Sequence, residues 1–145
     1  MIHSQNHKVV AEVPSAAIGA TATATLTIDT IGFDHASLTV MRASNASTVF
    51  ASVIKVEESD DNSTYTNVTA LVGGGTGGFT IPAVSSTSAT SILKMDIDTR
   101  AKKRYLKVSY TPGATATVAI TARLGRGEES PASSTDAGVI GRVVG

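Results

Sequence analysis

Polar and apolar residues alternate in several stretches of this chain. In residues 21–29, threonine alternates with Ala, Leu and Ile. Residues 92–98 repeat the pattern, with Leu93, Met95 and Ile97 on one side and charged residues on the other. Successive side chains of a β-strand point to opposite faces. Each stretch therefore predicts a strand with one buried face and one solvent-facing side.

Shorter apolar stretches, separated by turn residues, extend this prediction along the chain. The glycine run at residues 73–78 predicts a flexible loop, and Pro112 with Gly113 marks a turn. The predicted strands are residues 8–13, 21–29, 36–42, 48–57, 64–71, 92–98, 105–111 and 114–124, with residues 79–84 as a possible short edge strand. No helical period separates them, which argues against a parallel α/β sheet. We therefore expect an all-β protein with an antiparallel β-sandwich or jelly-roll-like body of about eight strands.

Two extended arms are expected to flank this body. Residues 1–20 are assigned to an N-terminal arm, residues 21–124 to the β-sandwich body and residues 125–145 to a C-terminal arm. The last segment is polar and rich in Ser and Gly until its apolar end. This composition is typical of segments that do not build a core of their own.

Composition and charge narrow the classes of function. The chain has 145 residues, with 12 basic and 12 acidic side chains, so its formal net charge is zero. A chain without net positive charge is not expected to bind nucleic acid through its phosphates. No run of about 18 apolar residues predicts a membrane-spanning segment. No apolar signal segment is recognised near residue 1, and the absence of cysteine favours assembly in a reducing compartment.

The acidic stretch at residues 55–68, KVEESDDNSTYTNV, is open to three interpretations. It could be a hairpin turn, an adventitious metal site or a catalytic carboxylate pair. A calcium loop would need Gly and Glu at later positions that do not carry them here. Asp and Asn at a hairpin tip accept hydrogen bonds from the local backbone and tolerate left-handed geometry. We favour the turn.

No arrangement of residues predicts catalysis. The glycine run lacks the Lys-Ser/Thr ending of a phosphate loop, and no nucleophile elbow or Cys/His pair is present. We therefore expect a protein that is not an enzyme, with no cofactor and no bound metal.

Two segments together resemble a pattern in small head proteins of tailed bacteriophages. The matching positions are Val56, Ser59, Asp60, Asn62, Tyr65, Val68 and residues 103–108. Tyr65 stands where that pattern has Trp. The resemblance implies a capsid decoration, or cement, protein that is β-rich, often trimeric and without catalytic residues. It would bind the major capsid protein on the exterior of the virion and assemble in the cytoplasm of the bacterial host.

Two sets of residues are candidates for contact with the capsid or a sister subunit. The basic set could be a solvated turn or could dock on an acidic surface. The apolar set at the C-terminal end could be disordered or could dock on a neighbouring chain, because burial of each side chain yields roughly 1.5–3 kcal/mol. The basic set is Lys102, Lys103 and Arg104, and the apolar set is Val139, Ile140, Val143 and Val144.

An alternative function is a carbohydrate- or receptor-binding β-module of a phage tail or cell surface. Such modules commonly present flat aromatic rings to the ligand. This chain has no Trp and three Tyr. Of these, Tyr65 and Tyr105 are expected to pack at the core or its rim. The aromatic content therefore favours the structural role.

Overall fold

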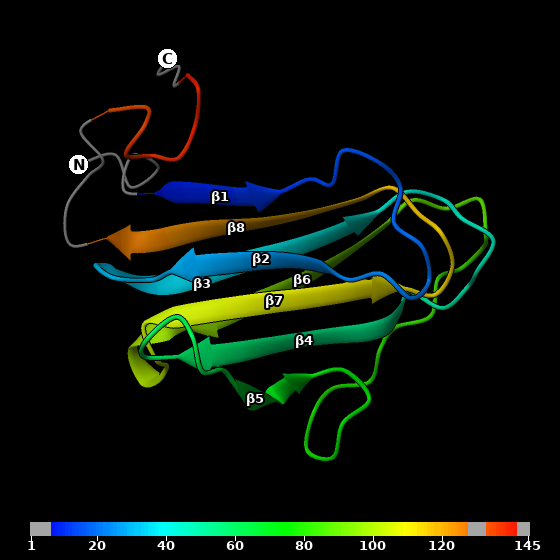
Figure 1. Ribbon diagram of the computed structural model, residues 1–145, viewed down its shortest axis with the longest axis horizontal. Coiled ribbons are helices and arrows are strands. Elements are labelled where there is room, and N and C mark those ends of the chain that lie inside the picture. The colour runs from blue at the N-terminus through cyan, green and yellow to red at the C-terminus, as the bar shows by residue number, and fades with distance from the viewer. Residues whose placement is uncertain (1–6, 128–132, 142–145) are drawn as a thin grey trace.

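The computed structural model describes residues 7–127 and 133–141 and consists of two packed antiparallel sheets (Figure 1). The eight strands are β1 (Lys8–Glu12), β2 (Ala24–Asp29), β3 (Phe33–Arg42), β4 (Ala51–Ser59), β5 (Thr66–Val72), β6 (Ser91–Asp98), β7 (Tyr105–Pro112) and β8 (Val118–Gly127). A single 3₁₀ turn, Thr99–Ala101, joins β6 to β7. The expected all-β sandwich is confirmed. No helix in the described residues is long and apolar enough to cross a membrane.

The order of the strands is that of a jelly roll. The first sheet has the order β1-β8-β3-β6, and the second has the order β2-β7-β4-β5. Each pair of neighbouring strands in both sheets is antiparallel. Eight strands divided in this order between two four-stranded sheets form the double Greek key of jelly-roll proteins. The last strand, β8, lies between β1 and β3, and β7 lies between β2 and β4.

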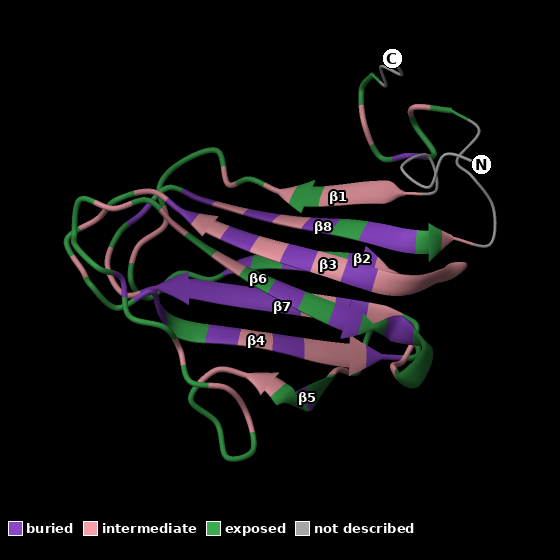
Figure 2. Ribbon diagram, turned by 180° about the vertical axis from the view of Figure 1, so that it is seen from behind, coloured by how far each residue is buried: buried purple, intermediate pink, exposed green. Residues whose placement is uncertain are grey.

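The core lies between the two sheets, where alternate residues of each strand point inward (Figure 2). In β2 the inward residues are Ala24, Leu26 and Ile28, as the alternation predicts. In β6, Met95 and Ile97 are buried and Lys94 and Asp96 are exposed, which is also as predicted. The alternation therefore identifies both faces of these strands correctly.

Two large polar side chains, Tyr110 and Arg42, are fully buried. Tyr110 is 0% exposed and packs its ring against Phe50, with ring centroids 5.4 Å apart. Arg42, at the end of β3, is also 0% exposed. Its Nη1 donates to the carbonyl oxygens of Ser47 (3.1 Å) and Val49 (3.0 Å), which holds the loop after β3 against the sandwich. Its Nε and Nη2 have no hydrogen-bond partner among the described residues.

The structure differs from the sequence-based expectation at one predicted strand. Residues 79–84 form no strand and make only isolated bridges through Phe79 and Ala83. Pro82 has no amide hydrogen for a sheet ladder, which accounts for this difference. Residues 8–12, within the range assigned to the N-terminal arm, form edge strand β1 and pair with β8. β8 itself continues to Gly127.

Candidate functional site

The acidic stretch forms the tip of the β4–β5 hairpin. The Asp61 carboxylate accepts hydrogen bonds from the Ser59 hydroxyl (2.8 Å) and from the backbone amides of Ser63 (2.9 Å) and Thr64 (2.8 Å). The Thr64 amide, followed by these other donors, lowers the pKa of Asp61 to about 2. Asn62 has a left-handed φ of 56°. The interpretation as a hairpin turn is therefore confirmed, because these contacts are those of an Asx-type turn.

Beside the hairpin, charged residues cross the outer face of the second sheet. The Glu57 carboxylate forms ion pairs with the Nζ atoms of Lys55 (2.9 Å) and Lys107 (3.1 Å). Burial raises the pKa of Glu57, but the two lysines outweigh it and the pKa ends below its ordinary value. The Nζ atom of Lys107 also lies 4.1 Å from the centroid of the Tyr65 ring, a cation–π contact. Tyr65 and Tyr105 are both half-buried, as expected for residues at the rim of the core.

The predicted basic docking set is largely paired within the chain. Arg104 makes a two-point ion pair with Asp29, at 2.9 and 2.8 Å, and this contact lowers the pKa of Asp29. Lys103 lies 3.0 Å from Asp60, which raises the pKa of Lys103. The side-chain ammonium group of Lys102 donates to the carbonyl oxygen of Ala101, at 3.2 Å. Of the three, Lys102 alone has no carboxylate partner among the described residues.

The described part of the C-terminal segment, residues 133–141, lies against edge strand β1 (Figure 1). The Val9 amide donates to the Ala137 carbonyl oxygen at 2.8 Å, and Ala137 is buried. Val139 is half-buried, whereas the side chain of Ile140 is fully exposed at 110%. Val143 and Val144 of the predicted apolar set lie outside the described residues. The described tail is therefore bound to β1 and presents an unburied isoleucine.

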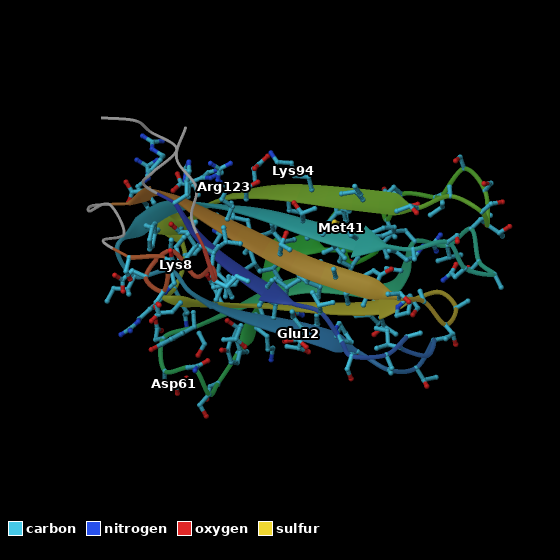
Figure 3. The ribbon with its side chains drawn as sticks, turned by 90° about the horizontal axis from the view of Figure 1, so that it is seen from above. Lys8, Glu12, Met41, Asp61, Lys94 and Arg123 are labelled. Atoms are coloured by element: carbon cyan, nitrogen blue, oxygen red, sulfur yellow. The ribbon has the colours of Figure 1, made fainter. Side chains whose placement is uncertain are left out.

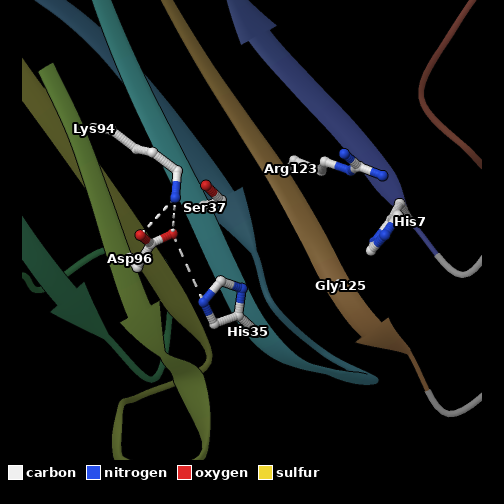
Figure 4. A pocket seen from close by; sticks show the side chains of 7 residues that line it. All are labelled: His7, His35, Ser37, Lys94, Asp96, Arg123 and Gly125. Carbon is white, nitrogen blue, oxygen red and sulfur yellow. Dashed lines mark hydrogen bonds and ion pairs between the residues drawn. The ribbon is translucent and has the colours of Figure 1, made fainter. Parts of the chain in front are cut away.

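A hollow of about 320 Å³ opens on the outer face of the first sheet (Figure 4), the face on which Figure 3 labels Lys94 and Arg123. We call it the sheet hollow. It is lined by His35 and Ser37 of β3, Lys94 and Asp96 of β6, Arg123 and Gly125 of β8, and His7. The strand register explains the gathering, because Ser37 lies opposite both Arg123 and Asp96. A β-carbon at Gly125 would lie 2.9 Å from the His7 ring, so a larger residue there would make the His7 ring shift from its place over β8.

Charge is distributed unevenly over the sheet hollow. Asp96 is 2.6 Å from Lys94 and 3.8 Å from His35. Hydrogen bonds from Lys94 and then Ser37 lower the pKa of Asp96. Arg123 is exposed, and its side chain has no hydrogen bond or ion pair with any residue that the structure describes. One side of the hollow thus holds an acid and a base that pair with each other, and the other side carries a guanidinium group with no anionic partner among the described residues.

Sequence reasoning did not find the sheet hollow. Its residues come from four separate parts of the chain, and only the sheet register brings them together. Within residues 7–127 and 133–141, no three His, Asp or Glu side chains are grouped as a metal site would require. The acidic tip also borders a smaller hollow of about 150 Å³, but its carboxylates Asp60 and Asp61 are already engaged by Lys103 and the turn amides.

Comparisons with known proteins add little to this description. No protein-family model matches the chain, and no curated protein matches its sequence. A partial structural likeness links it to a solved chain from work on Bacillus endospore appendages, which form a novel family of disulfide-linked pili. The identity is 14%, the likeness covers 82% of this chain and 89% of that chain, and the TM-score is 0.37. At that score, the similarity carries no argument about function.

Proposed function

We propose that this chain is a structural protein of a virus particle, a decoration or cement protein that binds the outer surface of a tailed-phage capsid. The resemblance of the β4–β5 hairpin and of the strand beginning near Lys103 to phage head proteins supports this proposal. The jelly-roll body supplies a rigid framework, which suits a protein that holds surfaces together and has no catalytic role.

The observation that carries the attachment mechanism is the exposed Ile140 on a segment bound to β1. The Val9–Ala137 hydrogen bond fixes this segment at one end of the sandwich, close to the start of β1 (Figure 1). Burial of an isoleucine side chain contributes roughly 1.5–3 kcal/mol, a gain that the isolated chain does not make. Contact with a capsid subunit or with a sister chain would provide it.

A homotrimer would multiply these modest contacts. Linked contacts increase the overall binding strength because the later ones form within one complex, at high effective concentration. Three chains around a local threefold position would each contribute an Ile140 contact, and together they would resist opening of the shell. Lys102, which has no carboxylate partner in the described chain, would add attraction to an acidic capsid surface.

The test uses particles of the encoding phage assembled without this chain. Purified chain should bind them to a saturating copy number and raise the temperature at which the shells release DNA. Ile140→Ser should weaken binding about tenfold or more, since it removes roughly 1.5–3 kcal/mol of burial. Ile92→Ser is the matched control, because Ile92 is also exposed (64%) but lies in β6, outside the tail. Absence of saturable binding by the unaltered chain would refute the proposed function.

A further inference from the structure

The sheet hollow has the two kinds of surface that a small hydroxylated acid requires. Toward β8, the Arg123 guanidinium group is exposed and unpaired within the described chain (Figure 4). Toward β6, Asp96 and Lys94 form a paired acid and base, 2.6 Å apart, beside the Ser37 hydroxyl. Gly125 lies between the two sides and adds no side chain that would fill the space.

The Arg123 side matches a carboxylate. The guanidinium group offers N–H donors in a planar fork that can hold both oxygens of one carboxylate. Lys94 already pairs with Asp96, whereas Arg123 has no anionic partner in the described residues. An incoming carboxylate would therefore gain most from Arg123 and would be repelled from the Asp96 side.

The Asp96 side matches hydroxyl groups. A carboxylate accepts hydrogen bonds from hydroxyls, while the Lys94 ammonium and the Ser37 hydroxyl can donate to them. A simple anion would leave the Asp96 acceptor oxygens unused, and a neutral sugar would leave the charge of Arg123 without a counterion. The hollow measures about 320 Å³, which is at the lower end of the range that small-ligand sites occupy.

We infer that the sheet hollow binds a sugar acid, with the carboxylate on Arg123 and the ring hydroxyls over Ser37, Asp96 and Lys94. Neither Ile140 nor Lys102, the proposed capsid contacts, lines the hollow. It can therefore be tested on the isolated chain, and either proposal can fail without the other.

The experiment is a titration of the full chain followed by backbone amide NMR shifts, with glucuronate as the probe. Acetate and glucose serve as matched ligands that carry only the carboxylate or only the hydroxylated ring. We expect glucuronate to shift the amides of residues 35–37, 94–96 and 123–125 and to bind about tenfold or more tightly than either matched ligand. Equal affinity for acetate or for glucose would overturn the inference, as would the absence of localised shifts.

Variants separate the two sides of the site. Arg123→Gln should weaken glucuronate binding about tenfold or more, because a charge-assisted hydrogen-bonding partner is lost. Arg123→Lys should have an intermediate effect because it keeps the charge but not the fork. Ser37→Ala should weaken glucuronate without changing the weak effect of acetate, because it removes a hydroxyl contact and leaves the Lys94–Asp96 ion pair in place. Lys102→Gln is the matched control, because it removes one positive charge outside the sheet hollow. An equal loss of glucuronate affinity in Lys102→Gln and Arg123→Gln would contradict the inference.

Discussion

The hydroxyl group of Tyr110 donates a 2.6 Å hydrogen bond to the backbone carbonyl oxygen of Phe50 inside the sandwich. Tyr110 lies on β7, and Phe50 directly precedes β4, so the bond supplements the ladder between these strands. Both residues are buried. The bond therefore ties a connecting loop to the core without any contribution from water.

Tyr110→Phe is expected to destabilise the fold by about 1–3 kcal/mol, because it leaves the buried Phe50 carbonyl without a donor while the ring packing is kept. Urea unfolding measures the change. Tyr105→Phe is the matched control, since the Tyr105 ring is half-buried and its hydroxyl makes no hydrogen bond to the described residues. It should change the free energy of unfolding by less than about 0.5 kcal/mol. Equal losses in the two variants would contradict the assigned role of the buried bond.

The same tyrosine makes stability depend on alkaline pH. Burial raises the pKa of Tyr110 to about 12 from its ordinary value of 10.0. The unfolded chain therefore loses this proton first, and stability falls as pH rises from 10.0 toward about 12. Over that range Tyr110 should contribute a loss of about 2–3 kcal/mol. Urea unfolding of the native chain and of Tyr110→Phe across this range isolates the effect, because other titrating groups are common to both; parallel pH profiles would contradict it.

At acid pH, Asp61 should act in the opposite direction. Its pKa is lowered from 3.8 to about 2 by the turn amides and the Ser59 hydroxyl, so the folded chain releases this proton more readily than the unfolded chain. The stabilisation is present above pH 3.8 and is lost as pH falls through about 2. Asp61→Asn keeps an acceptor oxygen but removes the charge. The thermal unfolding midpoint of this variant should therefore depend less on pH in this range than that of the unaltered chain. Asp61→Ala should lower the midpoint even at neutral pH, and Asp60→Ala should lower it less.

Deletion of residues 138–145 tests the tail. Ala137, which accepts the Val9 amide, remains in this variant, so the sandwich should keep its urea midpoint. Attachment to capsids and formation of trimers should both be reduced, as measured by co-sedimentation and by light scattering. Unchanged attachment and unchanged trimer stability would show that the tail has no docking role.

The glycine turn after β5 should tolerate no β-carbon at Gly78. An alanine there would place its β-carbon 1.9 Å from the Val72 carbonyl oxygen, which accepts the 3.2 Å bond from Phe79. Gly78→Ala should therefore destabilise the fold by about 2 kcal/mol or more. Gly19→Ala, with no atom within 4 Å of its β-carbon, should change stability by less than about 1 kcal/mol. A similar urea midpoint for the two variants would contradict this prediction.

The strands could be predicted because burial follows a period of two along each of them. The same alternation that places Leu38 and Val40 inward also places Arg42 there. From the sequence alone, this alternation would not be used to predict a buried arginine, because buried charges are rare without a partner. The carbonyl oxygens of Ser47 and Val49, which make this burial possible, become visible only when the loop is placed.

The contacts between distant residues could not be predicted. Lys103 and Arg104 looked like a free basic surface, but sheet pairing brings Asp29 beside Arg104, and the hairpin brings Asp60 beside Lys103. The sheet hollow depends in the same way on the register of β3, β6 and β8. Local pattern determines which side of a strand a residue occupies, and only the fold determines its neighbours.

The position of β8 between β1 and β3 also sets a condition on synthesis of the chain. While a ribosome is still making the protein, β1 has no partner in the first sheet, and β3 can pair only with β6. Closure of that sheet must wait until Gly127 has left the exit tunnel, so β1 to β7 are all exposed before the central pairing begins. Folding should then be slow, because the central pairing joins segments far apart in the sequence, and the β1 and β3 edges are open to incorrect pairing until β8 arrives.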